Sequence, residues 1–273
     1  MDPLHGNRRV EAGPLTFFAP LEPLAGIGHL VMTTRAGGLS QPPYDTLNLG
    51  AHVGDVGERV RLNRRKVAAA LGRKLREPVV PDQVHGTRVQ AVGELHAGTR
   101  WEQPERALDG TDALITAATR LPLVVLVADC LPIAVADPVR RAGAVIHAGW
   151  RGLADGIVEA TFTLMAQTWG SEAADLHVWA GPAIGPCCYE VGPEVAHRFG
   201  GFTRPGEGDR VQLDLRAALH ARLGRAGVNE ENITGLPLCT ACQAELFFSH
   251  RRATRAGYDT TGRQALFFWL DPS

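Results

Sequence analysis

The stretch LPLVVLVADC at residues 121–130 is an apolar run that ends abruptly in a carboxylate and a thiol. Its first eight residues are rich in β-branched side chains, which predicts a short buried strand over 121–128. The segment AGAVI at 142–146 has the same character, and HAGWRG follows it directly. Residues 178–180 and 266–269 indicate further strands, so buried strands form the centre of the predicted fold.

Three helices are predicted around these strands. Residues 153–169 place five side chains on one stripe at four-residue spacing, and Gly170 ends the helix. A second helix spans 56–71 with Asp55 as its N-cap, and a third runs over 214–227. Helices that cover buried strands indicate a mixed α/β (α+β) fold, whose strand order does not follow from the sequence. The stripe consists of Leu153, Ile157, Thr161, Met165 and Trp169.

The length and composition are those of one soluble domain. The 273 residues include 45% hydrophobic residues, and 28 Lys and Arg nearly balance 29 Asp and Glu. This balance indicates no nucleic-acid partner, and the longest apolar stretch, 121–136, is too short to span a membrane. Residues 1–14 lack the apolar core of a secretory signal, which predicts a flexible N-terminal tail before a single domain over 15–273.

Five cysteines are an odd number without the spread of a disulfide framework, which indicates a reducing, cytoplasmic location. Cys239 and Cys242 form a CxxC pair, but no second pair follows at zinc-ribbon spacing. Cys187 and Cys188 are adjacent, a geometry that is poor for a shared zinc ion. The sequence therefore indicates no role for these four cysteines, and we interpret the CxxC pair as incidental.

Three metal-binding side chains stand at the ends of predicted elements. Cys130 follows the strand over 121–128, His147 follows the strand over 142–146, and His85 lies in QVHG at a strand-to-turn junction. Taken singly, they have simpler explanations, as a small buried thiol and two turn histidines. Together, two imidazoles and a thiolate are a zinc donor set that leaves a fourth position open for water, phosphate or substrate, which is typical of a catalytic site.

Residues around this trio suggest binding of an anion. Two glycines in the segment from His147 to Gly152 permit a tight turn into a helix, where Arg151 and backbone N–H groups would attract phosphate. The segment TTRAGGLS at 33–40 offers Thr34, Arg35 and Gly38 for the same purpose, although an ordinary hairpin turn explains it equally well.

Three polar residues within apolar surroundings are further candidates. Asn63 lies on the apolar stripe of the helix over 56–71, where a satisfied core asparagine is favoured over direct substrate contact. Asp112 and Asp129 are candidates for orienting a histidine ligand or carrying a proton.

Several segments together resemble the laccase-domain family, called multicopper polyphenol oxidases in older usage and bacterial purine nucleoside phosphorylases more recently. The likeness spans roughly residues 27–270. It includes TTRAGGLS at 33–40, LNLG at 47–50, QVHG at 83–86, TDALIT at 111–116, ADCLPIAVAD at 128–137, HAGWRGL at 147–153, GPAIGPCCYEVG at 181–192, FFSHRR at 247–252 and TGRQA at 261–265.

This resemblance implies a layered α/β/β/α fold, related to a bacterial cysteine-hydrolase toxin, with zinc held by His85, Cys130 and His147. It also implies phosphorolysis of purine nucleosides to the free base and ribose 1-phosphate, with possible adenosine deamination, by a monomer or weak homo-oligomer. Arg35, Asp129, Cys130 and Arg151 then become catalytic candidates. The candidates for substrate binding are Thr34, Gly38, Asn48, Asn63, Gln83, Asp112 and Trp150.

Two rival activities stay open at this point. Copper-dependent polyphenol oxidation is disfavoured, because a trinuclear copper cluster uses His-x-His pairs and this sequence has none, although two histidines and a cysteine also occur in blue-copper centres. A cysteine hydrolase or amidase, with Cys130 as nucleophile and His147 as base, is the other rival, and the family resemblance links it to editing of peptidoglycan precursors.

Overall fold

The first of two large β-sheets is antiparallel throughout, with the strand order β1-β2-β3-β14-β6. The C-terminal strand therefore lies inside this sheet, between strands that come from much earlier in the chain. The computed structural model describes residues 4–72, 74–101 and 108–272. The strands of this sheet are β1 (Asn7–Ala12), β2 (Leu15–Pro20), β3 (Gly28–Thr33), β14 (Gln264–Leu270) and β6 (Leu123–Val127).

The second sheet has the order β13-β9-β7-β8-β5-β4, with parallel pairing at its two edges and antiparallel pairing inside. The predicted strands are confirmed, and the strand predicted over 142–146 continues to Ala148, so that His147 lies within it. The strands are β13 (Ile233–Gly235), β9 (His177–Ala180), β7 (Leu131–Asp137), β8 (Ala142–Ala148), β5 (Ala113–Thr116) and β4 (Val89–Ala91).

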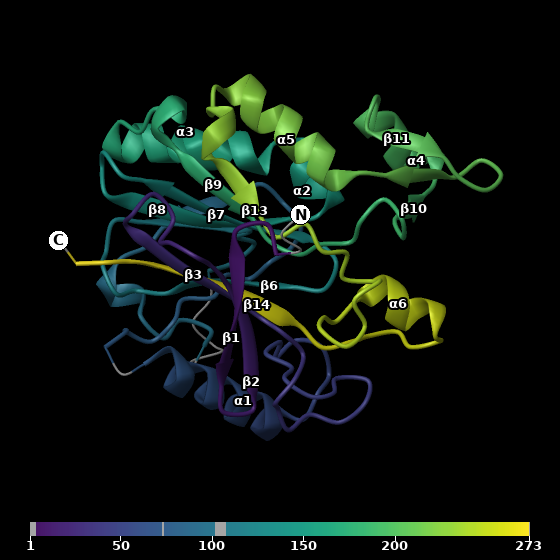
Figure 1. Cartoon of the computed structure of the whole chain (residues 1–273), viewed down its shortest axis with the longest axis horizontal. Helices are drawn as coiled ribbons and strands as arrows, with labels where there is room; N and C mark the ends of the chain where they lie inside the picture. Colours follow the sequence, from purple (N-terminus) through teal and green to yellow (C-terminus); the bar gives the residue numbers. More distant parts are fainter. Residues whose placement is uncertain (1–3, 73, 102–107, 273) are drawn as a thin grey trace.

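Helices cover the outer faces of the two sheets (Figure 1). On the first sheet lies α1 (Gly57–Leu71), and on the second lie α2 (Trp150–Asp155), α3 (Ile157–Trp169) and α5 (Leu215–Ala226). The predicted layering of helix, sheet, sheet and helix in one mixed α/β domain is therefore confirmed. Its likeness to a cysteine-hydrolase toxin stays a prediction.

Shorter elements gather at one end of the layers (Figure 1). A small sheet of order β10-β12-β11 projects there beside α4 and α6. The strands are β10 (Glu190–Val191), β11 (Thr203–Pro205) and β12 (Val211–Leu213), and the helices are α4 (Pro193–Ala196) and α6 (His250–Arg255). Single 3-10 turns lie at Glu94–His96, Ala173–Asp175, His197–Phe199 and Glu230–Asn232.

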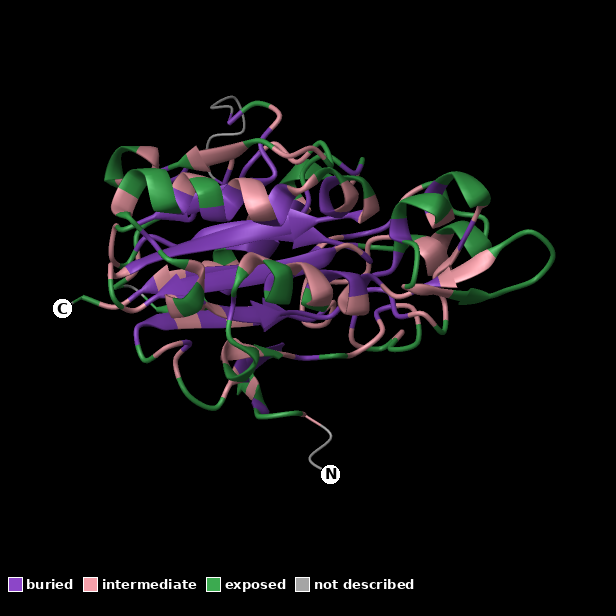
Figure 2. Ribbon diagram, turned by 90° about the horizontal axis from the view of Figure 1, so that it is seen from above, coloured by how far each residue is buried: buried purple, intermediate pink, exposed green. Residues whose placement is uncertain are grey.

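Strand alternation divides the apolar side chains among three core layers. In β6, Val125 enters the layer between the sheets, whereas Val124 and Leu126 enter the layer under α1. In β8, Val145 enters the layer between the sheets, whereas Ile146 packs toward α3. Because successive side chains of a strand point to opposite faces, continuous apolar runs are what a strand covered on both faces requires. Figure 2 shows the buried strands enclosed by partly exposed helices.

Three sequence predictions about these elements are wrong. Residues 7–12 of the expected flexible tail form β1, because they pair with β2 over its whole length. The helix expected over 153–169 is two helices, since Gly156 adopts a left-handed conformation (φ 96°) between α2 and α3. The carboxylate of Asp55 does not cap α1, because it accepts hydrogen bonds from the side chains of Ser40 and Asn48.

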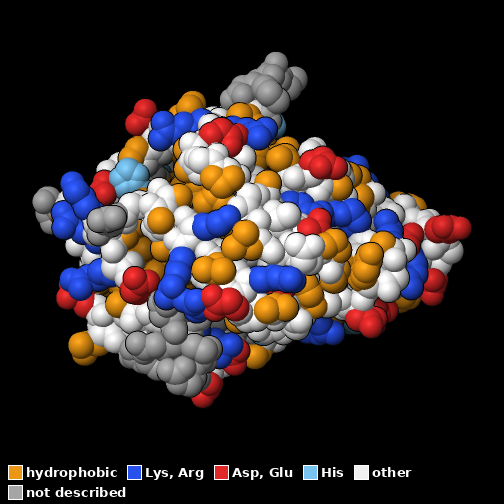
Figure 3. Space-filling view, turned by 90° about the horizontal axis from the view of Figure 1, so that it is seen from below, with side chains coloured by type: hydrophobic (Ala, Val, Ile, Leu, Met, Phe, Trp, Pro, Cys, Tyr) orange, Lys and Arg blue, Asp and Glu red, His pale blue; other side chains and the backbone are white. Residues whose placement is uncertain are grey.

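The predicted third helix is confirmed as α5. The Asp214 carboxylate accepts a hydrogen bond from the Ala217 amide at 3.0 Å, as an N-cap should, and Gly227 ends α5 in a left-handed conformation. None of the described helices is long and apolar enough to cross a membrane. The face drawn in Figure 3 carries basic and acidic side chains interspersed with apolar ones, in keeping with the nearly balanced charge.

Candidate active site

His85, Cys130 and His147 converge at one end of the space between the two sheets. One potential ligand atom from each residue lies within 4.8 Å of those of the other two. Cys130 occupies the turn between β6 and β7, and His147 lies in β8, which pairs with β7. His147 is two residues beyond Val145, so it points toward the same inter-sheet side. His85 comes from the loop before β4, in a left-handed conformation (φ 63°).

Asp112 holds two members of this trio in place. Its carboxylate accepts a hydrogen bond from Nδ1 of His147 at 2.8 Å and from the backbone amide of His85 at 2.9 Å. The amides of Val84 and Gly86 donate to its other oxygen at 3.2 and 2.7 Å. Asp112 thus fixes the orientation of the His147 ring and the course of the loop that carries His85. It is fully buried.

The charges within the trio favour a thiolate beside an imidazolium in the metal-free protein. Burial opposes ionisation of the Cys130 thiol, but the imidazoles of His147 and His85 outweigh it and lower the Cys130 pKa to about 6. Burial likewise opposes protonation of His147, but Cys130 and Asp112 outweigh it and raise the His147 pKa to about 9. The site therefore presents a thiolate at neutral pH without any metal.

Gly149 leaves room for the trio. A Cβ atom at this position would lie 2.8 Å from Cδ2 of His85 and 3.1 Å from Sγ of Cys130. The next element, α2, begins at Trp150, and a Cβ on Gly152 would lie 2.8 Å from the carbonyl oxygen of Gly86. Both glycines of HAGWRG are thus required by close approach between the start of α2 and the loop that carries His85.

Asp129 connects the strand end to α6. It has a left-handed backbone (φ 92°), which is uncommon for a residue with a side chain. Its carboxylate accepts hydrogen bonds from Oγ1 of Thr240 at 2.6 Å and from the amide of Arg251 at 2.7 Å. Asp129 therefore positions Arg251 at the beginning of α6, next to the turn that carries Cys130.

The trio opens into a cavity of about 440 Å³. Its wall combines apolar side chains with a few polar and charged ones, which is typical of a small-molecule site. The cavity is lined by His52, Gln83, His85, Leu126, Val127, Ala128, Asp129, Cys130, His147, Trp150, Arg151, Ile184, Tyr189, Leu215, His250, Arg251 and Arg263.

Three guanidinium groups border this cavity. Arg251 donates to the carbonyl of Glu190 at 2.8 Å and lies over the ring of Tyr189, and Arg263 donates to the carbonyl of Thr261 at 2.6 Å. Arg151 is exposed and lies over the ring of Trp150, and no described carboxylate pairs with it. The cavity is therefore suited to an anionic ligand beside the trio.

The model of the family described as multi-copper polyphenol oxidoreductase laccase matches residues 29–271. The chain belongs to this family. It is 38% identical over 245 residues to the purine nucleoside phosphorylase YfiH of Escherichia coli, covering 87% of this chain and 92% of that protein. It is 36% identical over 247 residues to the purine nucleoside phosphorylase YlmD of Geobacillus stearothermophilus, covering 86% of this chain and 88% of that protein.

The solved structure of the hypothetical protein YfiH of Bacillus licheniformis has the same fold. It matches with a TM-score of 0.89 at 33% sequence identity, and covers 99% of this chain and 100% of that one. The laccase-family architecture therefore extends over nearly the whole chain, with the trio and its cavity inside the matched region.

Some predicted substrate-binding residues of this laccase-family chain are buried structural residues instead. Thr34, Asn48, Asn63 and Asp112 are all fully buried and line no part of the cavity. Asn63 accepts from the amide of Leu39 and donates to neighbouring carbonyl groups, which is the satisfied core asparagine that the sequence favours. Their polar atoms bind the protein itself, so the structure does not bring these four residues to the cavity, and direct substrate contact by them stays a prediction.

Arg35 and Gly38 also lie outside the cavity wall. The Arg35 guanidinium pairs with the Asp45 carboxylate at 3.0 Å, donates to the carbonyl of Ala244 and lies over the ring of Phe248. Gly38 packs against the backbone of Thr46, where a Cβ would lie 2.1 Å from the carbonyl oxygen. Neighbouring groups therefore hold Arg35 away from the cavity wall, and its phosphate-binding role stays a prediction.

Gln83, Asp129, Trp150 and Arg151 do line the cavity, as their predicted roles require. Both side-chain ends of Gln83 bind the backbone of Leu126, so it joins its loop to β6. Other polar and aromatic residues of the wall were not predicted from the sequence, although all of them except His52 stand in segments that carry the family resemblance. The missed polar and aromatic residues are His52, Tyr189, His250, Arg251 and Arg263.

Proposed function

We propose that this chain is a zinc-dependent purine nucleoside phosphorylase, which converts adenosine, inosine, guanosine or methylthioadenosine and phosphate to the base and ribose 1-phosphate. The observation that carries the proposal is the convergence of two imidazoles and one thiol on a cavity bordered by three guanidinium groups. The names of the relatives in Escherichia coli and Geobacillus stearothermophilus support the same activity.

The donor set fits zinc. His85, Cys130 and His147 supply three borderline or soft ligands, and the cavity on their open side leaves a further position for a small molecule. When bound, zinc supplies a Lewis acid that stabilises negative charge. A trinuclear copper centre fits less well, because it uses more histidines than the two that meet here. Asp112 fixes the His147 ring through Nδ1, which leaves Nε2 for the metal.

The cavity wall can hold both substrates. Arg151, Arg251 and Arg263 attract phosphate, and a guanidinium group binds phosphate oxygens with two parallel hydrogen bonds. Trp150 and Tyr189 offer aromatic surfaces for a purine base. In phosphorolysis a phosphate oxygen bonds to C1′ of the ribose while the bond from C1′ to the base breaks. The protein's part is to hold these groups close and in line.

The two carboxylates have different parts in this proposal. Asp112 is buried and orients His147, whereas Asp129 lies in the wall and positions Arg251. Deamination of adenosine by the same site is the finer proposal, with water replacing phosphate as the attacking molecule. We propose a cytoplasmic location, since all five cysteines are free thiols as in a reducing compartment.

A cysteine hydrolase is the second candidate, because Cys130, His147 and Asp112 are arranged like a thiol nucleophile, its base and the orienting carboxylate. His85 argues against it, since a thiol triad needs no second imidazole beside its sulfur. Iodoacetamide distinguishes the two candidates: a zinc-bound thiolate is protected until a chelator removes the metal, whereas a nucleophilic thiol reacts without chelator.

The direct test is incubation of purified protein with adenosine, inosine and guanosine, with and without phosphate. We expect phosphate-dependent release of free base together with ribose 1-phosphate, and loss of both in Cys130→Ala and His147→Ala proteins. Deamination would appear as inosine formed from adenosine without phosphate. Full turnover by a Cys130→Ala protein without metal would overturn the proposal.

A further inference from the structure

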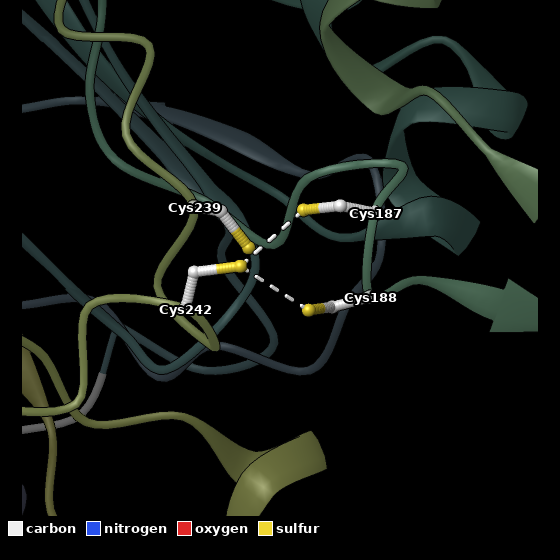
Figure 4. Close-up of side chains that lie close together, drawn as sticks. All are labelled: Cys187, Cys188, Cys239 and Cys242. Atoms are coloured by element: carbon white, nitrogen blue, oxygen red, sulfur yellow. Dashed lines mark hydrogen bonds between the residues drawn. The ribbon is translucent and has the colours of Figure 1, made fainter.

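Four cysteines outside the active site meet on the surface of the described structure. Cys187 and Cys188 come from the loop between β9 and β10, and Cys239 and Cys242 come from the segment after β13. Figure 4 shows the four side chains directed toward a common point, and all four sulfur atoms lie within 4.8 Å of one another. Sγ of Cys242 lies 3.5 Å from the sulfurs of both Cys187 and Cys188.

We propose that Cys187, Cys188, Cys239 and Cys242 bind a second zinc ion, as a closed structural site separate from the trio. With zinc–sulfur bonds of about 2.3 Å, tetrahedral geometry places the sulfurs about 3.8 Å apart. The two contacts of 3.5 Å and the upper limit of 4.8 Å for the other pairs are compatible with this distance. Four thiolates leave no open position, so this site holds structure and takes no substrate.

Local backbone geometry explains how two adjacent cysteines share one ion. In an extended strand their side chains would point to opposite sides. Here they lie in a turn, in which the amides of Cys188 and Tyr189 both donate to the carbonyl of Gly185 at 2.9 and 3.0 Å. Successive side chains in such a helical turn differ by about 100° in direction, so both sulfurs reach the same side of the loop.

The second pair is brought to the first by backbone pairing. Ala183 and Cys239 form an isolated parallel bridge, and the amide of Thr240 donates to the carbonyl of Ala183 at 3.0 Å. Gly185 permits the close approach, because a Cβ there would lie 3.2 Å from Cβ of Cys239 and 3.4 Å from Sγ of Cys187. The four sulfurs are therefore assembled by the fold without any disulfide.

Two contacts beside the cluster favour negatively charged sulfur. The Gly185 amide donates to Sγ of Cys239 at 3.2 Å, a contact that strengthens when the sulfur is a thiolate. Arg252 donates to the carbonyls of Thr240 and Ala241, inside the turn that joins Cys239 to Cys242. Its positive charge offsets part of the net negative charge of a zinc tetrathiolate.

This cluster lies behind the wall of the active-site cavity. Thr240, next to Cys239, donates to the Asp129 carboxylate, and the carbonyl of Cys188 accepts a hydrogen bond from Arg251. A zinc ion that joins the two loops would therefore hold Asp129 and Arg251 in position.

Metal content of the full-length protein tests this site without any activity assay. We expect two equivalents of zinc by mass spectrometry of the native protein, and five free thiols after denaturation with a chelator. After cobalt replaces zinc, the strong visible absorption of a tetrahedral thiolate site should appear. One equivalent of metal bound at the trio, a disulfide within the cluster, or iron with inorganic sulfide would each overturn the proposal.

Matched cysteine variants assign the two ions. Cys242→Ser and Cys187→Ser proteins should each keep only the ion at the trio. Cys130→Ala, the control that alters the fifth cysteine, should keep only the cluster ion. If both serine variants fail to fold, the cobalt absorption of the Cys130→Ala protein still shows whether the four cysteines bind a metal ion. Absorption without the thiolate bands of a four-sulfur site would refute the proposal.

Discussion

Replacement of Asp112 by asparagine should weaken both the fold and the metal site. The two carboxylate oxygens accept four hydrogen bonds, from His147 Nδ1 and from the amides of Val84, His85 and Gly86. An asparagine keeps one oxygen and turns the other into an N–H₂ group, which faces two donors instead of accepting from them. Two hydrogen bonds to a charged group are thus lost in the better of the two amide orientations.

The expected magnitude follows from these contacts. Each such hydrogen bond contributes about 1.5–3 kcal/mol, and water can replace part of this at the exposed loop, so we expect a loss of about 3 kcal/mol. That corresponds to a Tm lower by roughly 5–10 °C for a chain of this size. Loss of a group that orients a metal-binding histidine also lowers metal affinity by roughly 10- to 100-fold.

The pH dependence of this loss has a definite sign. Burial raises the pKa of Asp112, but the hydrogen bond and charge of His147 outweigh it, and the folded-state pKa is lowered. The stability that the carboxylate contributes is therefore present at neutral pH and is lost as the pH falls through the folded-state pKa. The difference in stability between wild type and Asp112→Asn should shrink on acidification.

Thermal unfolding of the metal-free proteins and zinc competition with a chromogenic chelator measure the two effects. Asp137→Asn is the matched control, because Asp137 is equally buried and lies far along β7 from the trio. One of its oxygens accepts hydrogen bonds from the amides of Val139 and Arg140, and the other oxygen has no hydrogen-bond partner among the described residues. The Asp137→Asn protein should lose no more than about 1 kcal/mol of unfolding free energy and should keep its zinc affinity. If the Asp112→Asn protein has the same Tm and the same zinc affinity as the wild type, the reasoning is refuted.

Three further perturbations test the same site. Gly149→Ala should lower zinc affinity at least tenfold in a chelator competition, because its Cβ would meet His85 and Cys130. The control Gly224→Ala has open space around its Cβ and should raise the free energy of unfolding by about 0.5–1 kcal/mol. Equal zinc affinity of the two variants would contradict this prediction. Asp129→Ala should lower kcat/KM about tenfold with zinc at the trio retained, since the Arg251 amide loses its acceptor; unchanged steady-state kinetics would show that Arg251 needs no such support. Iodoacetamide should alkylate Cys130 of the metal-free protein with a midpoint near pH 6, and the rate should fall below that pH as the thiolate is protonated; a peptide-mapped midpoint above pH 8 would disprove the lowered pKa.

The mixed α/β fold could be predicted from the sequence because its central strands are covered on both faces. Such strands are continuous apolar runs, as in 121–128. The division into two layered sheets followed from the family resemblance alone, because the runs do not show which strands pair. The break at Gly156 could not be predicted in this way, because Leu153 and Ile157 pack into the same core layer and keep the spacing of one helix. Sequence periodicity indicates which core layer a side chain enters. Because α2 and α3 contribute to the same layer, it does not reveal the break between them.

The convergence of His85, Cys130 and His147 could be predicted because each of them stands next to a recognisable strand or motif. The position of Arg35 outside the cavity wall could not be predicted, because its partner, Asp45, lies ten residues away in a turn whose course the sequence does not show. Arg251 and Arg263 were missed for the converse reason. Insertion of β14 between β3 and β6 brings the C-terminal segment to the cavity, and this long-range pairing leaves no local pattern.

The two cysteine-containing sites differ in what holds them together. Cys130 and His147 are placed by the register of β7 against β8, which pairs Leu131 with Ala148, and a slip of one residue would turn His147 to the opposite face. Metal at the trio therefore adds little to the fold, and its removal should stop turnover while the sheets stay intact. The four-cysteine cluster joins two loops that pair through an isolated bridge and not through a strand ladder, so an ion there should contribute mainly to loop stability. A chelator that removes both ions should thus cause two separable losses. Catalysis at the trio should stop, and the wall behind Asp129 should become less ordered.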